Sequence, residues 1–170
     1  LFFVDTSWYV FSNFILARLF HLFPVRLGTS SPTFSWYVLV RFDQLFLGTV
    51  TIDFSTKDGA DLVRQLAAKA DILIENFKPG GLQKYGLDYA SIAAFNPGII
   101  YCSITGFGQT GPYSHRSGYD FLIQGMGGLM SITGQPDGSP GSGPMKVGVA
   151  VCDLFTGMFA ANAALAALAY

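Results

Sequence analysis

The amino-acid sequence predicts an α/β fold in which helices flank a parallel sheet. Three short, apolar, β-rich segments follow one another between Thr49 and Thr105, and the residues between them have helical patterns. Parallel strands joined by helical crossovers produce this alternation. With 170 residues, the chain is long enough for one domain with its own core.

The predicted strands are short and are separated by turn residues. They cover residues 49–54 (TVTIDF), 71–75 (DILIE) and 99–105 (IIYCSIT). A helical turn at residues 81–85 and a short helix at 88–95 lie between the second and third strands. From residue 71 on, each segment is followed by a residue that favours turns, namely Asn76, Gly86, Asn96 or Gly106.

The first helix is expected directly after the first strand. Ser55 is the expected N-cap, because its hydroxyl can accept a hydrogen bond from a free N–H of the first turn. The helix itself is expected from Asp58 to Ala70. Leu62, Leu66 and Ala70 lie four residues apart and define its apolar face.

The stretch from residue 118 to 160 is organised around one acid. Apolar segments rich in small residues, at 121–130 and 154–170, are typical of buried helices. The apolar run 147–152 is expected to present Asp153 at a strand-to-helix junction. There, free N–H groups and the helix dipole would hold a carboxylate ionised. A simple capping role is the alternative for such a residue.

Residues 1–47 differ from residues 48–170, and we treat the two as separate segments. The first holds nine of the sixteen Phe and one of the twenty Gly. Its apolar run 8–23 is interrupted by Arg18 and closed by a proline, so it is too short to span a membrane, and no membrane partner is expected. The sequence starts without Met and stops inside an apparent helix, which predicts a truncated chain.

The composition excludes some partners. A net charge of −1 argues against nucleic acid. With 51% hydrophobic and 12% charged residues, either much surface is buried in a partner or part of the chain is not a native globular segment. Two distant cysteines, Cys102 and Cys152, favour an intracellular compartment, cytoplasmic or mitochondrial. His21 and His115 lack metal-ligand spacing, so no metal site is expected.

A glycine motif follows the third strand but lacks the context of a dinucleotide site. Residues 106–111 fit the pattern G-x-G-x-x-G. The residues after it, 112–118, have a loop pattern, whereas a dinucleotide site needs a helix that begins within the motif. We therefore predict a glycine turn, at which the backbone can approach its surroundings closely.

Several longer motifs resemble the class III CoA-transferase family, which includes formyl-CoA transferase and succinyl-CoA:glutarate-type CoA-transferases. The motifs, in family order, are VTIDFSTKDG (50–59), ADILIENFKPGGLQKYGLDY (70–89), NPGIIYCSITGFGQTGPYSHRSGYD (96–120), QGMGGLMSITGQPDG (124–138) and KVGVAVCDLFTGMFAA (146–161). The resemblance covers residues 48–170 and not residues 1–47. It implies part of the Rossmann-like large domain of that family, whose members form interlocked homodimers.

The resemblance also implies an enzyme. The family moves CoA from an acyl-CoA thioester to a small carboxylic acid, with CoA as a substrate and carrier and with no permanently bound cofactor. Asp153 aligns with the family's nucleophile, which forms an acyl-aspartyl anhydride and then an aspartyl-CoA thioester. The activity of a truncated chain is left open by this comparison.

The resemblance assigns CoA contacts to eight further residues, each of which also has an ordinary structural interpretation. They are Ile52, Ser55, Asn76, Phe77, Lys78, Lys84, Arg116 and Gly118. Residues 52–55 are expected to contact the adenine end through the backbone, and residues 76–78 follow a strand end where α/β folds bind ligands. Lys84 suits a phosphate. Without the resemblance, these residues are those of a polar turn, a solvated helix face, a surface arginine and a turn glycine.

Two other interpretations stay open. Acyl-CoA racemases of the same superfamily use a histidine in a G-H-D element together with the same aspartate, but this sequence has Gly118-Tyr119-Asp120. The chain can also be an inactive truncated fragment, or a remnant that interacts with a full-length relative.

Overall fold

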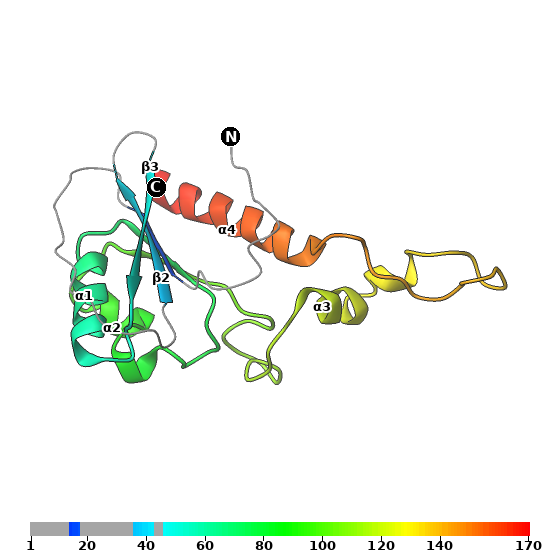
Figure 1. The fold of residues 1–170 in the computed structure, drawn as a ribbon, viewed down its shortest axis with the longest axis horizontal. Helices are drawn as coiled ribbons and strands as arrows, with labels where there is room; N and C mark the ends of the chain where they lie inside the picture. Colours follow the sequence, from blue (N-terminus) through cyan, green and yellow to red (C-terminus); the bar gives the residue numbers. More distant parts are fainter. Residues whose placement is uncertain (1–13, 18–35, 43–45) are drawn as a thin grey trace. The chain divides into compact units, whose positions relative to one another are not determined.

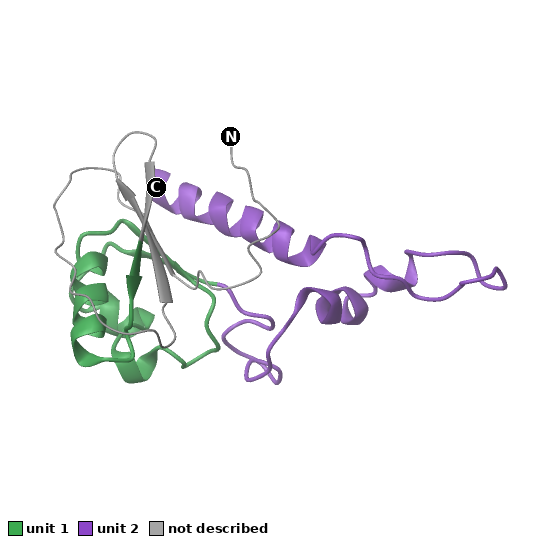
Figure 2. Cartoon of the chain, viewed as in Figure 1, with its two compact units in different colours: residues 1–103 green, residues 104–170 purple. Residues whose placement is uncertain are grey.

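The chain forms two compact units, residues 1–103 and residues 104–170 (Figure 2). The computed structural model describes the backbone of residues 14–17, 36–42 and 46–170, and side chains from residue 50 on. The first unit contains the sheet, and the second contains two α-helices and a long loop.

The first unit is a five-stranded sheet with two short α-helices (Figure 1). Its elements are β1 (Phe14–Ala17), β2 (Trp36–Phe42), β3 (Phe46–Ile52), α1 (Lys57–Ala67), β4 (Ile72–Glu75), the 3-10 turn η1 (Gln83–Tyr85), α2 (Tyr89–Ala93) and β5 (Ile100–Ser103). Every element expected between residues 49 and 105 is present. The predicted α/β fold is confirmed.

The sheet has the strand order β3-β2-β1-β4-β5. β4 and β5 pair in parallel, whereas β1 is antiparallel to β4 and β2 is antiparallel to β3. Because β1 and β2 are parallel to each other, β3 runs in the same direction as β4 and β5. The three predicted strands are therefore parallel, as expected. Two strands from the aromatic-rich segment, which the patterns did not predict, lie between them.

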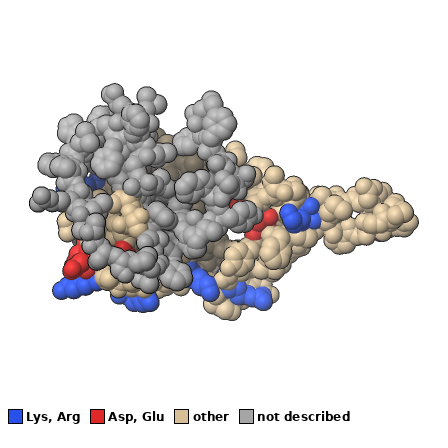
Figure 3. All heavy atoms as spheres, in the orientation of Figure 1, with Lys and Arg blue, Asp and Glu red and all other residues tan. Residues whose placement is uncertain are grey.

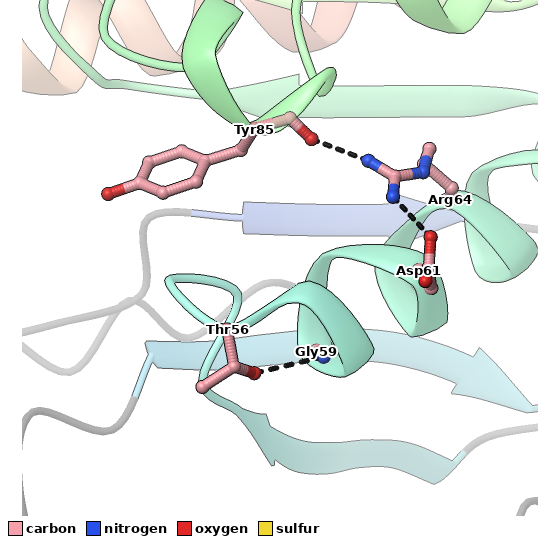
Figure 4. Close-up of polar contacts among 5 residues, drawn as sticks. All are labelled: Thr56, Gly59, Asp61, Arg64 and Tyr85. Atoms are coloured by element: carbon pink, nitrogen blue, oxygen red, sulfur yellow. Dashed lines mark hydrogen bonds and ion pairs between the residues drawn. The ribbon is translucent and has the colours of Figure 1, made fainter.

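Thr56, not Ser55, is the N-cap of α1. The Thr56 hydroxyl oxygen accepts a hydrogen bond from the Gly59 N–H at 3.1 Å (Figure 4). The Ser55 hydroxyl instead donates to Asp53 Oδ1 at 2.6 Å. The prediction for Ser55 is wrong. β3 ends at Ile52, two residues earlier than expected, and the turn that follows it extends through Ser55, so that the cap is one residue later, at Thr56.

α1 packs on the core through smaller side chains than the pattern predicted. Ala60, Val63 and Ala67 are the buried residues of the helix. Leu62 and Leu66 are half-buried and pack against the edge of the core. The buried stripe is rotated by about one residue, because Ala and Val allow the helix to approach the sheet closely.

Two polar side chains attach α1 to the following segments. The Asn96 amide donates to the carbonyls of Ala67 and Ala70, both at 2.9 Å, and so satisfies groups at the C-terminal end of the helix. Arg64 bonds to Asp61 and donates to the Tyr85 carbonyl of η1 at 2.5 Å (Figure 4). The Arg64 contact fixes η1, and with it the neighbouring Lys84, against α1.

The second unit contains α3 (Asp120–Met126), the 3-10 turn η2 (Leu129–Ser131) and α4 (Val151–Ala169). α4 begins three residues before the expected position, and residues 147–150 form no strand. The predicted strand-to-helix junction is therefore wrong: a loop leads into the helix, and Asp153 lies within its first turn.

The two helices of the second unit were expected to be buried, and within this chain they are not. Gln124 is the only buried residue of α3, and Ala164 is the only one of α4. The surface of this unit is mostly uncharged in the view of Figure 3. By length and composition alone, α4 is the one helix in the described ranges that could cross a membrane, a test that the core helices of soluble proteins also pass.

We expect Thr56→Ala to lower the free energy of unfolding by about 1 kcal/mol, because it removes the cap of α1. Urea denaturation would measure this. Ser55→Ala is the matched control: its hydroxyl is exposed and lies outside the helix, so its effect should stay within about 0.5 kcal/mol. Equal effects of the two substitutions would contradict the assignment of the cap.

Candidate functional site

The segment after β4, where CoA contacts are predicted, is fixed by a buried acid. Glu75, the last residue of β4, is 6% exposed. Its Oε2 accepts a hydrogen bond from the Phe77 N–H at 2.7 Å, and the carboxyl also bonds to the Ser103 side chain. Desolvation raises the pKa of Glu75 above its ordinary value, although these hydrogen bonds oppose the rise.

Aromatic rings bring the segments after β3 and β4 together. The Phe54 ring packs edge-on against Phe77, with 5.6 Å between centroids, and against Tyr85 at 5.1 Å. The Lys84 ammonium lies 4.6 Å from the centroid of the Tyr85 ring. The residues after β3 therefore share one cluster with the residues after β4 and with η1, even though β1 and β2 lie between β3 and β4 in the sheet.

The predicted CoA contacts of the first unit differ in exposure. Asn76, Lys78 and Lys84 are exposed, and Phe77 is half-buried. Two cations on neighbouring turns, beside an aromatic cluster, can bind a phosphorylated ligand that carries an aromatic base. This is the chemistry that the first unit offers.

Ile52 and Ser55 have less freedom to contact a ligand. Ile52 is 4% exposed, and its side chain belongs to the core. The Ser55 N–H and hydroxyl both donate to Asp53 Oδ1, at 3.0 and 2.6 Å. A contact through the backbone of residues 52–55 stays a prediction.

In the second unit, Asp153 is exposed on the first turn of α4. The N-cap residue, Ala150, provides no side-chain cap. Asp120 of α3 takes that place: its Oδ1 accepts from the Cys152 N–H at 2.8 Å and from the Asp153 N–H at 3.4 Å. The helix N–H groups expected to stabilise the Asp153 carboxylate are thus already bound to another carboxylate.

The electrostatics of Asp153 differ in direction from those expected. Desolvation and, second, the negative charge of Asp120 raise the pKa of Asp153 above its ordinary value. Asp120 contributes repulsion where free N–H groups would have given attraction, and that the helix terminus holds this acid ionised stays a prediction.

Neither cysteine has the environment of a nucleophile. Desolvation raises the pKa of the Cys102 thiol, and Glu75 adds to the effect. The pKa of Cys152 is raised by desolvation and by the two neighbouring aspartates, Asp120 and Asp153. Reactive cysteines need the opposite surroundings, which stabilise the thiolate.

Arg116 and Gly118 belong to a closed loop. Gly106 and Gly118 approach so closely that a Cβ on Gly118 would lie 2.5 Å from the Gly106 Cα. Within the loop, the Arg116 guanidinium lies 5.0 Å from the Tyr113 ring centroid, and that ring packs against Phe107. No helix begins within residues 106–111, as expected. Gly118 closes the loop, and Arg116 is exposed on it.

The nine predicted site residues fall into two groups. Six lie in the first unit, and Arg116, Gly118 and Asp153 lie in the second. Within the described ranges, no three His, Cys, Asp or Glu residues could hold a metal, and His21 lies outside those ranges. Sequence reasoning missed Glu75 and Asp120. Glu75 had a signal, since it is the only glutamate in the sequence and it ends an apolar strand.

We expect Glu75→Gln to change the pH dependence of stability. With its pKa raised, the folded chain binds this proton more tightly than the unfolded chain, so wild-type stability falls as pH rises from the unfolded-state pKa to the folded-state pKa. Each unit between the two pKa values corresponds to about 1.4 kcal/mol. The variant lacks this loss, so its stability relative to wild type should increase above about pH 4.

Urea denaturation at a series of pH values from about 4 to about 8 would test this expectation. Asp137→Asn, a carboxylate-to-amide change in an exposed loop, is the control. A difference between variant and wild type that stays constant with pH would contradict the assignment.

We expect Gly118→Ala to destabilise the second unit by about 2 kcal/mol, because the new methyl group would collide with the backbone of Gly106. Gly148→Ala is the matched control, since a Cβ there meets nothing within 4 Å. Hydrogen exchange of residues 104–120 would measure the effect. Equal protection in the two variants would mean that the loop is not closed by this contact.

Comparison with known proteins identifies a family. The model of "CoA-transferase family III" matches residues 48–170. A succinate–glutarate CoA-transferase of Agrobacterium fabrum is 58% identical over 120 residues, which cover 71% of this chain and 29% of that protein. A human succinyl-CoA:glutarate CoA-transferase is 43% identical over 145 residues, which cover 85% of this chain and 31% of that protein.

A solved structure agrees. The crystal structure of a CAIB/BAIF family protein from Brucella suis matches with a TM-score of 0.66 and 53% identity, over 77% of this chain and 31% of that one. The chain therefore spans about three-tenths of the length of these relatives, from 29% to 31%. Because the family model covers residues 48–170, which is more than half of the sequence, the chain belongs to CoA-transferase family III.

Proposed function

We propose that this chain carries part of the active site of a CoA-transferase, in which Asp153 is the nucleophile. The observation that carries the proposal is the exposed Asp153 carboxyl on the first turn of α4, inside the segment that matches the family model. An exposed carboxylate with a raised pKa is accessible and more basic than usual, and both properties favour attack on a thioester.

The proposed reaction begins with two steps that load CoA onto the enzyme. Asp153 attacks the acyl carbon of the donor thioester, the C–S bond breaks, and CoA leaves as a thiolate. The thiolate then attacks Cγ of Asp153 in the resulting anhydride and releases the donor acid as a carboxylate. The product is an aspartyl-CoA thioester, and no proton is taken up or released.

Two further steps transfer CoA to the acceptor. The acceptor carboxylate attacks Cγ of Asp153, CoA leaves as a thiolate, and a second anhydride forms. The thiolate attacks the acceptor carbon of that anhydride, which gives the new acyl-CoA and regenerates the Asp153 carboxylate. Each step needs CoA held beside Asp153, because only then is the attack effectively intramolecular.

The first unit provides the groups that would hold CoA. The exposed ammonium groups of Lys78 and Lys84 suit its phosphates, and the turn at Asn76 and Phe77 is held in place by Glu75. Ile52 and Ser55 would contribute backbone groups. Arg116, which belongs to the second unit, would offer a further cation. CoA enters this proposal as a substrate, and no resident cofactor is part of it.

The relatives narrow the proposed substrates. Two of them are named for succinate or succinyl-CoA and glutarate, so we propose acyl-CoA donors and acceptors that are small dicarboxylic acids. We also propose a homodimer, because α4 carries exposed apolar side chains, including Phe155 and Phe159, that suit burial against protein. The two cysteines, which lie far apart in the sequence, are the basis for proposing an intracellular compartment.

The sequence next to Asp120 does not favour a racemase as a second function. Its proton transfer needs an acid–base group next to Asp120, and this position holds Tyr119, which is exposed at the start of α3. The experiment below also tests whether the chain is an inactive fragment.

We expect Asp153→Asn to reduce CoA transfer from succinyl-CoA to glutarate by about a thousandfold or more, because the amide keeps the shape of the side chain but is not a nucleophile. Product analysis with labelled succinyl-CoA would measure the loss. Hydroxylamine added during turnover should convert Asp153 of the wild-type chain into a hydroxamate, which mass spectrometry can locate.

Asp137→Asn is the matched control and should transfer CoA at the wild-type rate, since Asp137 is exposed in a loop. Transfer by Asp153→Asn at the wild-type rate would refute the mechanism. A wild-type chain that binds acyl-CoA but neither transfers it nor forms the adduct would favour the inactive-fragment interpretation.

A further inference from the structure

The first turn of α4 is capped from another helix. Asp120, the first residue of α3, accepts the Cys152 N–H at 2.8 Å and the Asp153 N–H at 3.4 Å through the same oxygen, Oδ1. The position of Asp153 therefore depends on where the Asp120 carboxylate is held.

Asp120 is held by a buried amide. The Gln124 Nε2 donates to Asp120 Oδ2 at 2.5 Å, and the Gln124 Oε1 accepts from the Val147 N–H at 2.9 Å. Gln124 is 0% exposed, and its Nε2 also lies 3.3 Å from the Val149 carbonyl. The segment that leads into α4 and the carboxylate that caps α4 are thus fixed by one side chain.

Asp120 is also the charged group that acts on Asp153. After desolvation, it is the cause that raises the Asp153 pKa. In the described residues, Lys146 forms no ion pair with Asp120 or Asp153, and its ammonium donates to the Val147 carbonyl at 3.2 Å. The Arg116 guanidinium lies over the Tyr113 ring. The Cys152 thiol, whose pKa is raised too, adds no opposite charge.

We propose that Asp120 is a positioning residue that fixes the first turn of α4 and, by its charge, favours the acylation of Asp153. The inference rests on the proposed function, because it assigns Asp120 a part in the same reaction. When Asp153 forms the anhydride or the thioester, its negative charge leaves with the CoA thiolate or the donor acid. Repulsion from Asp120 is relieved at that moment, so Asp120 destabilises the free enzyme more than the acylated one.

The decisive variant is Asp120→Asn, which keeps an oxygen for the Cys152 N–H and removes the charge. Its amide nitrogen would face the Gln124 Nε2, so this variant also disturbs the network. Gln124→Met is the structural control, because it breaks the network but leaves the Asp120 charge in place.

The first measurement does not require catalysis. A ¹³C NMR titration of the Asp153 carboxyl should give a lower pKa in Asp120→Asn than in wild type. Gln124→Met should keep the raised value. An unchanged Asp153 pKa in Asp120→Asn would overturn the inference, and so would an equal fall in Gln124→Met, since the effect would then be structural.

The second measurement separates this inference from the proposed function. We expect Asp120→Asn to lower kcat for CoA transfer about tenfold without changing KM for the acyl-CoA, because ground-state binding is left intact. A lowered Asp153 pKa with unchanged kcat would overturn the catalytic part of the inference alone. If Asp153→Asn is fully active, the proposed function fails, whatever the titration shows.

Discussion

The carboxylate of Asp120 is the constraint on which the second unit depends. In residues 104–170, buried side chains are limited to Gln124 and Ala164, so an apolar core does not hold this part of the chain. Polar bonds do: Asp120 joins the start of α3 to the start of α4, and Gln124 joins both to the loop between them. Side-chain networks of this kind specify one geometry only when every member has a partner, and in the described residues no buried side-chain polar atom lacks one.

The first unit is held together by an apolar core, and its buried carboxylate, Glu75, has a smaller part. Leu73, Leu87, Ile92 and Val63 are fully buried and stabilise the sheet and helices by apolar contact. Glu75 then needs only to fix the turn that follows β4. In both units a partly desolvated acid bonds to backbone N–H groups next to the residues proposed to meet substrate. Each acid thereby holds the neighbouring backbone in a fixed position relative to the strand or helix that carries the acid.

Sequence patterns predicted the features that depend on neighbouring residues. They did not predict the features that depend on residues distant in the sequence. Strand periodicity located β3, β4 and β5, because alternation and apolar runs act within a few residues. The positions of β1 and β2 in the sheet depend on pairing across tens of residues, which composition does not encode. Asp153 was identifiable from its motif, but its raised pKa was not, since the causes are desolvation in the folded chain and a charge 33 positions away in the sequence. Burial of α3 and α4 was overpredicted because apolar composition does not say which chain covers it.

The contact between Gly106 and Gly118 has a consequence for how this family can diversify. Because Gly106 and Gly118 are in contact, the residues between them form a loop whose two ends meet. The number of residues in this loop therefore does not change the position at which α3 begins. Lengthening such a loop costs little entropy, since closure depends only on the logarithm of its length. The surface of Phe107, Tyr113 and Arg116 can therefore change in size and in sequence at little cost to the geometry around Asp120 and its helix.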